Sequence, residues 1–212
     1  MIERFKKHYF ITLSLVFITG IIFYIRSTNL DAVTLITQST GYISIILLTF
    51  SLTIGPINLI LKRKNPVSTY FRRDLSIIGG SLAVIHSVAG LFVHLRGKTW
   101  LYFLNKTDQG FSIRLDNFGL ANYTGLISAL IIILLLITSN DYLLKKLKPY
   151  NWKNIQRLSY LIFFLTLVHC YFYRIGKEHL NIFYWLYIPV FIIVLTFQII
   201  GICLRLTGKG KN

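Results

Sequence analysis

Six long apolar runs recur along this chain of 212 residues, and they constrain its fold more than any other feature. An α-helix needs about 17–25 apolar residues to cross roughly 30 Å of hydrocarbon. The runs have this length and cover residues 9–25, 41–61, 75–95, 118–138, 158–175 and 182–204. Because a bilayer offers no partners for free backbone groups, each run is expected to be helical. The pattern predicts an all-α integral membrane bundle of six transmembrane helices, forming a single domain over residues 1–212.

The charged residues agree with a membrane protein, since they make up only 14% of the chain against about 25% in soluble domains. The net charge of +16 does not indicate nucleic acid, because no basic soluble module is present to carry it. Instead, 16 of the 23 basic residues fall in segments on the side of the two termini, and seven fall on the other side. The positive-inside rule then predicts that both termini are cytoplasmic. The basic loops are expected to contact anionic membrane lipid.

Several classes of function are excluded by missing motifs. The two cysteines, Cys170 and Cys203, lie inside apolar runs and form no CxxC pair, which argues against thiol-oxidising membrane enzymes. The sequence has no GxGxxG or Walker pattern, and therefore no nucleotide domain is expected. The first apolar run lacks a cleavage site and is interpreted as a retained helix. The longest loop, about residues 96–117, is rich in aromatic residues and is predicted to lie along the outer leaflet.

Three histidines lie inside the apolar runs: His86, His94 and His169. An ionisable side chain at membrane depth is costly, so each is a functional hypothesis. His86 follows Arg72 by about 21 Å of helix and His169 follows Arg157 by about 18 Å, at 1.5 Å per residue. Both helices run outward, and the two imidazoles are therefore expected at nearly equal depth. Two imidazoles at one depth can take both axial positions of one haem iron.

Small and aromatic residues flank these two histidines. Gly79, Ala83 and Gly90 share a helical face with His86, and their size would let a porphyrin approach the backbone. Tyr173 lies one turn after His169 and could pack against the macrocycle.

The same residues allow other interpretations. Small residues on a membrane helix more often serve close packing against another helix. The histidines could also form a proton or ion relay in a transporter, or make structural hydrogen bonds in an assembly subunit without a cofactor. His94, further out than His86, is interpreted as an interface residue that could also contact a haem propionate or a redox partner. These alternatives remain open at the level of residue spacing.

Four segments resemble the ferric-reductase-like transmembrane domain family. They read GYISIILLTFSLTIGP, RRDLSIIGGSLAVIH, LLLITSND and NIQRLSYLIFFLTLVH, in the order and spacing of that family. The resemblance covers residues 41–172. Within the family, the sequence is most similar to the MsrQ group, the haem-binding membrane subunits of the periplasmic methionine sulfoxide reductase system.

The resemblance implies a b-type membrane cytochrome of the bacterial inner membrane, with His86 and His169 as the metal ligands. Such a protein is an electron-transfer subunit of an oxidoreductase system and has no catalytic residues of its own. Its electrons would come from a cytoplasmic flavin reductase or the quinol pool. Its acceptor would be a periplasmic MsrP-like methionine sulfoxide reductase, with a ferric chelate as the alternative.

One position departs from the family pattern. The family often has a second histidine 13 residues before the later haem ligand, and this sequence has Gln156 there. Glutamine is a poor haem ligand, so one haem is expected and not two. Gln156 and Arg157 are interpreted as contacts for FMN or a quinone near the cytoplasmic side, beside Trp152. The alternative is that Gln156 is an ordinary residue at a helix start.

Overall fold

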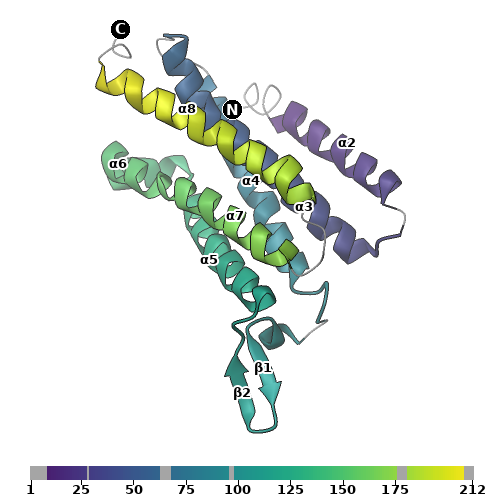
Figure 1. The fold of residues 1–212 in the computed structure, drawn as a ribbon. Helices are drawn as coiled ribbons and strands as arrows, with labels where there is room; N and C mark the ends of the chain where they lie inside the picture. Colours follow the sequence, from purple (N-terminus) through teal and green to yellow (C-terminus); the bar gives the residue numbers. More distant parts are fainter. Residues whose placement is uncertain (1–8, 28, 63–67, 96–97, 176–180, 208–212) are drawn as a thin grey trace.

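The structure is a computed structural model that describes residues 9–27, 29–62, 68–95, 98–175 and 181–207. Helices lie side by side and a small hairpin projects from one end of the bundle (Figure 1). The elements, in chain order, are α2 (Ile11–Arg26), α3 (Ala32–Ile60), α4 (Ser68–Gly90), η2 (Thr99–Tyr102), β1 (Leu104–Thr107), β2 (Gly110–Ile113), α5 (Asn117–Thr138), α6 (Asp141–Gln156), α7 (Leu158–Ile175), the π-helix η3 (Phe183–Tyr187) and α8 (Ile188–Leu206).

All six apolar runs overlap a helix, and the all-α class is confirmed. Among the described helices, the segments long and apolar enough to cross a membrane are Ala32–Ile60, Asn117–Thr138, Asp141–Ile175 and Phe183–Leu206. α2 has only 16 residues, and α4 carries Arg72, Arg73 and Asp74 near its start. These four segments support a multi-pass membrane protein, while the six-span count stays a prediction. Some of the basic residues behind the predicted orientation and two of the five histidines lie outside the described ranges: Arg4, Lys6, Lys7, His8, Arg63, Lys64, Arg96, Lys177, His179, Lys209 and Lys211.

The end of α4 differs from the predicted run of residues 75–95, because the helix stops at Gly90 and His94 follows it in a turn. The buried Tyr102 accounts for this end. Its hydroxyl donates to the Gly90 carbonyl and accepts from the backbone N–H of His94. A side chain from the following loop therefore satisfies backbone groups that a continuing helix would otherwise pair.

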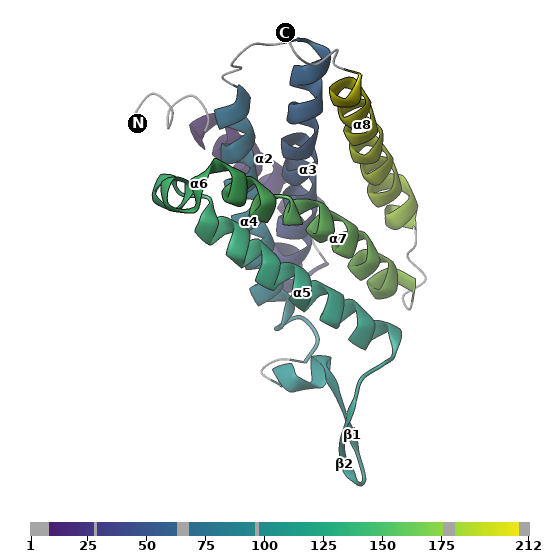
Figure 2. The ribbon, with the colours of Figure 1, turned by 90° about the vertical axis from the view of Figure 1, so that its left-hand side faces the viewer.

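The loop predicted to lie along the outer leaflet contains η2 and an antiparallel hairpin. β1 pairs with β2 from Leu104 opposite Ile113 to Thr107 opposite Gly110. In both ribbon views the hairpin extends beyond the helices, at the end opposite the last turn of α8 (Figure 2). Asp116 then caps α5 by accepting a 2.7 Å hydrogen bond from the Gly119 N–H. The neighbouring Arg114 guanidinium donates to that carboxylate and holds the pKa of Asp116 below its usual value.

The helix α6 was not predicted, because its lysine-rich sequence has no long apolar run. Asn140 caps its first turn by accepting a 2.7 Å hydrogen bond from the Leu143 N–H. The helix is kinked at Lys148, whose φ of 61° precedes Pro149. A proline disfavours helical geometry at the residue before it, which explains the position of the kink.

The bundle is built from neighbouring helix pairs. α4 packs mainly against α3 and α5, α7 packs mainly against α5, and α8 packs against α3. Buried residues of α3, α7 and α8 form one core cluster, made of Ile45, Leu52, Phe163 and Val194. The helix α2 packs mainly against α3 and leaves most of its apolar side chains exposed, as expected for a helix in lipid. The two histidine-bearing helices, α4 and α7, therefore share α5 as a neighbour, and α3 packs against α4 on its other side.

Candidate functional site

His86 extends from α4 onto the backbone of α3. Its Nδ1 lies 2.8 Å from the carbonyl oxygen of Thr37. The ring rests on Gly41, where an added Cβ would come within 2.7 Å of that nitrogen. Any larger residue at position 41 would have to displace the imidazole. The glycine therefore provides the space in which His86 reaches the α3 backbone.

His169 makes the same arrangement on the other helix pair. From α7, its Nδ1 lies 2.7 Å from the carbonyl oxygen of Ala121 on α5. An added Cβ at Gly125 would come within 2.9 Å of that nitrogen. In both cases the accepting carbonyl belongs to the residue four positions before the glycine, one turn earlier. Each histidine is therefore fixed by one carbonyl and one glycine of a neighbouring helix.

These hydrogen bonds determine which ring nitrogen is available for chemistry. A carbonyl oxygen only accepts, so the Nδ1 of each neutral imidazole must carry the proton. The lone pair is then on Nε2, on the side of the ring away from the carbonyl. A carbonyl that fixes the tautomer and orientation in this way is a regular companion of metal-ligating histidines.

The structure brings the two imidazoles together, with ring centres 6.2 Å apart and ring planes at 89°. An imidazole nitrogen lies about 2 Å from a metal that it ligates, and the centre of its ring lies about 1 Å further away. Two imidazoles on opposite sides of one metal therefore have ring centres about 6 Å apart. The described residues contain no group of three or more His, Cys, Asp or Glu side chains that could hold a bare metal ion. Two ligands are what a haem needs, because the porphyrin supplies the other four, and His86 and His169 fit that requirement.

An aromatic cluster continues from His169 toward the hairpin end. Tyr173 stacks on His169, with ring centres 6.0 Å apart and planes at 25°. Its hydroxyl is hydrogen-bonded to the Nε2 of His94, and both rings contact Phe118. Tyr173 therefore connects the ring of His169 to His94, which the sequence analysis had interpreted as an interface residue.

The small residues of α4 have other neighbours. An added Cβ at Gly79 would meet the Leu47 and Leu48 side chains at 3.2–3.4 Å, so this glycine lies against α3. An added Cβ at Gly90 would lie 3.7 Å from the methyl carbon of Thr37, which is an ordinary contact distance. Ala83 is half-buried, and its carbonyl accepts from the Ser87 hydroxyl. The contacts at Gly79 are those of close packing between two helices, which was the alternative to a haem contact for the small residues of α4.

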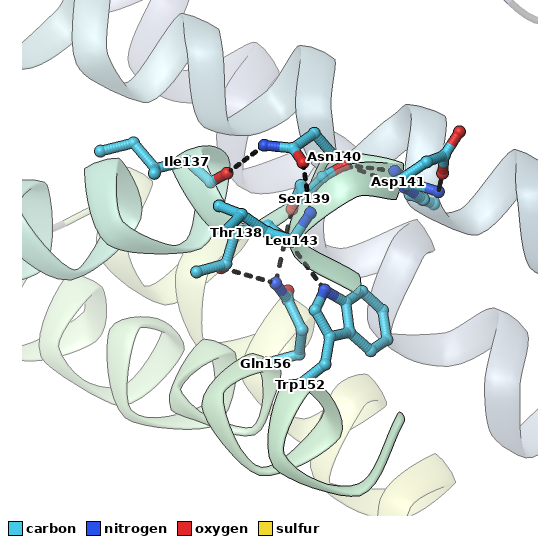
Figure 3. A network of polar contacts seen from close by, with 9 residues as sticks. Ile137, Thr138, Ser139, Asn140, Asp141, Leu143, Trp152 and Gln156 are labelled. Atoms are coloured by element: carbon cyan, nitrogen blue, oxygen red, sulfur yellow. Dashed lines mark hydrogen bonds and ion pairs between the residues drawn. The ribbon is translucent and has the colours of Figure 1, made fainter. Parts of the chain in front are cut away.

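Gln156 and Trp152 bind the end of α5 (Figure 3). Trp152 donates from Nε1 to the Thr138 carbonyl at 2.7 Å, and Gln156 donates from Nε2 to the Thr138 hydroxyl at 3.1 Å. On the other side of this junction Arg73 is paired with Asp141. The glutamine amide thus joins the end of α6 to the end of α5, while Arg157, the next residue, lines a cavity beside α8.

Sequence analysis did not identify Gly41 and Gly125 or the two carbonyls. Both glycines are visible in the sequence, but a glycine in an apolar helix is not specific. Only the rotation of α3 and α5 about their axes shows that these glycines face the histidines. A pairing of each membrane histidine with a glycine on another helix would have been the signal to seek.

The fold and this site define a class: a helical membrane bundle in which two imidazoles on different helices lie with their ring centres 6.2 Å apart. The family model described as the ferric reductase like transmembrane component matches residues 40–167. The chain belongs to this family, which indicates a function in electron transfer across the membrane. No curated protein and no solved structure matches the chain.

Proposed function

We propose that this chain is a b-type membrane cytochrome that holds one haem between His86 and His169. The observation that carries the proposal is the matching pair of imidazoles, each fixed through Nδ1 by a helix carbonyl and each lying on a glycine. A bound haem would supply one-electron oxidation and reduction at its iron. Because two histidines would ligate its iron, such a haem would have no position open for oxygen, which favours electron transfer over oxygen chemistry.

The residues around the pair have distinct parts in this proposal. The Thr37 and Ala121 carbonyls hold the proton on Nδ1 of each ring and keep Nε2 as the ligand atom. Tyr173 packs beside His169 and links its ring to His94 at the hairpin end. A proton relay through His86 and His169 is disfavoured, because a helix carbonyl has no proton to pass onward.

The proposed direction of transfer follows from the basic residues. With six spans and both termini in the cytoplasm of a bacterium, the hairpin end of the bundle lies outside the inner membrane. Electrons would enter from a cytoplasmic flavin reductase or the quinol pool, with FMN or a quinone near Gln156 and Arg157 as the inner donor. They would leave toward the hairpin. By its resemblance to MsrQ, we propose a periplasmic MsrP-like methionine sulfoxide reductase as the acceptor and a ferric chelate as the second choice.

Cysteine labelling tests this orientation. In a Cys203→Ser background, which removes the exposed thiol and keeps the buried Cys170, single cysteines replace Lys64, Lys148 or Lys106. A membrane-impermeant maleimide should label the first two only from the cytoplasmic side and the third only from outside. Lys106 lies on β1 and Lys148 at the α6 kink, while position 64 lies outside the described residues. Labelling with the sides exchanged would reverse the proposed direction of electron flow.

Haem quantification tests the proposal itself and the number of haems. Purified protein is expected to show a reducible b-type spectrum and to contain about one haem per polypeptide, because bis-histidine ligation needs two imidazoles for each iron. At the inner depth the equivalent positions are Arg72 or Arg73 and Gln156. An arginine remains protonated and cannot ligate iron, and the Gln156 amide is bonded to Thr138. Colourless protein would contradict the proposed function, and a ratio near two with two bis-histidine potentials would contradict the single haem.

A further inference from the structure

A second site lies at the end of the bundle opposite the hairpin. A cavity of about 550 Å³ opens between α3, α7 and α8, away from the two histidines. Apolar side chains of these helices form most of its wall. Its polar groups are three arginines together with Tyr160 and Gln198. The Tyr160 hydroxyl donates to the Gln198 side chain at 3.0 Å, and Gln198 donates to the Leu52 carbonyl at 2.7 Å, so these two groups are already satisfied.

The arginines Arg72, Arg157 and Arg205 are the charged groups of this cavity. Arg72 is half-buried and lies on Gly55, where an added Cβ would come within 3.0 Å of its Nη1. Arg157 and Arg205 are exposed at the rim. Among the described residues, Arg73 and Arg114 form ion pairs and these three arginines do not. Arg157 donates to the Asn154 side chain at 2.9 Å. The half-buried Arg72, with Arg205 lining the same cavity, places positive charge beside an apolar wall, which points to an anionic ligand.

The exposed apolar side chains of the cavity wall indicate the direction from which such a ligand would enter. Phe164, Leu195 and Ile202 line the cavity and are 52%, 48% and 56% exposed. All three lie on helices that are apolar enough to cross a membrane, where such exposed apolar faces would contact acyl chains. The cavity therefore opens sideways to the bilayer. A neutral quinone could enter from there but would leave the arginines without a counter-charge, and a water-soluble anion would gain nothing from the apolar wall.

We propose that this cavity binds an anionic phospholipid, with its phosphate on Arg72 and Arg205 and an acyl chain between α7 and α8. Guanidinium groups suit phosphate because they donate two parallel hydrogen bonds. Basic pockets between membrane helices on the cytoplasmic side are a known form of headgroup recognition. The site is separate from the histidine pair, and its occupation does not depend on the proposed haem.

Native mass spectrometry of the whole protein tests this inference. Protein titrated with phosphatidylglycerol or phosphatidylcholine in mild detergent is expected to prefer the anionic lipid by about tenfold, since headgroup charge is the difference between them. The double change Arg72→Gln with Arg205→Gln should remove this preference. Lys153→Gln is the matched control, because it removes an exposed charge on α6 that does not line the cavity. Arg205→Gln alone, at the rim, should weaken the preference without disturbing the half-buried Arg72.

Other ligands are separated by parallel titrations with FMN, inorganic phosphate and a short-chain quinone. Each is expected to leave bound phosphatidylglycerol in place. Displacement of the lipid by FMN or the quinone would overturn the lipid assignment and identify a redox cofactor site. Equal binding of the two lipids, or an unchanged preference in the double variant, would also overturn it. The experiment measures the mass of bound lipid, so a protein that does not bind the lipid is distinguished from one that does not bind haem.

Discussion

Replacing His86 or His169 with alanine is expected to remove nearly all haem from the purified protein. Loss of only a hydrogen-bond partner behind a ligating histidine costs roughly 10–100-fold in metal affinity, and loss of the ligand itself should cost more. The two single variants should behave alike, since each imidazole is held by the same kind of carbonyl and glycine contact. The measurement is the haem absorbance per polypeptide after purification.

His94→Ala is the matched control for this experiment. His94 follows the end of α4 and is bonded to Tyr173, outside the pair, so its loss should leave most of the haem bound. The same result is expected for His179→Ala, although position 179 lies outside the described residues. Size-exclusion profiles report whether each variant folds. Added imidazole should restore haem that stays bound to His86→Gly through size exclusion, which an unfolded protein would not retain. Unchanged haem absorbance in folded His86→Ala would refute the ligand assignment.

The common level of His86 and His169 could be predicted from the sequence because it depends only on helix rise and helix direction. Helix rise is constant, and both spans were assigned the same direction, so counting residues from the inner arginines placed the two rings at one level. The structure has the rings 6.2 Å apart. The all-α class could be predicted for a similar reason, since run length and hydropathy determine which segments form helices in a bilayer.

The contacts that fix the rings could not be predicted in this way. They depend on how α3 and α5 are rotated about their axes, and the apolar runs have no polar face to indicate that rotation. As a result Gly79 was proposed beside the haem and is found against Leu47 and Leu48, whereas Gly41 and Gly125 were not singled out. The helix α6 was not predicted for a different reason, because its lysines interrupt any apolar run. It is stabilised by its Asn140 cap and by contacts with the end of α5.

Gly41→Ala and Gly125→Ala are expected to weaken haem binding strongly, although neither residue is a ligand. A single added methyl group would lie 2.7 Å and 2.9 Å from the Nδ1 atoms of the two histidines, closer than real Cβ contacts. The imidazole would have to move and its bond to the helix carbonyl would break. Because that bond fixes the tautomer and the direction of Nε2, the affinity for haem should fall by about 10–100-fold.

Two other glycines provide controls that separate this local effect from a general loss of helix packing. An added Cβ at Gly90 would meet only a Thr37 methyl group at an ordinary 3.7 Å, and one at Gly20 would meet nothing within 4 Å. Gly90→Ala and Gly20→Ala should therefore keep wild-type haem content. A haem titration of the apo-protein, followed by absorbance, measures all four variants. If Gly41→Ala and Gly125→Ala bound haem as tightly as the two controls, the glycine contacts would have no part in holding the ligands. If only one of them lost affinity, the two halves of the site would not be equivalent, and the histidine on the unaffected side would be positioned by other contacts.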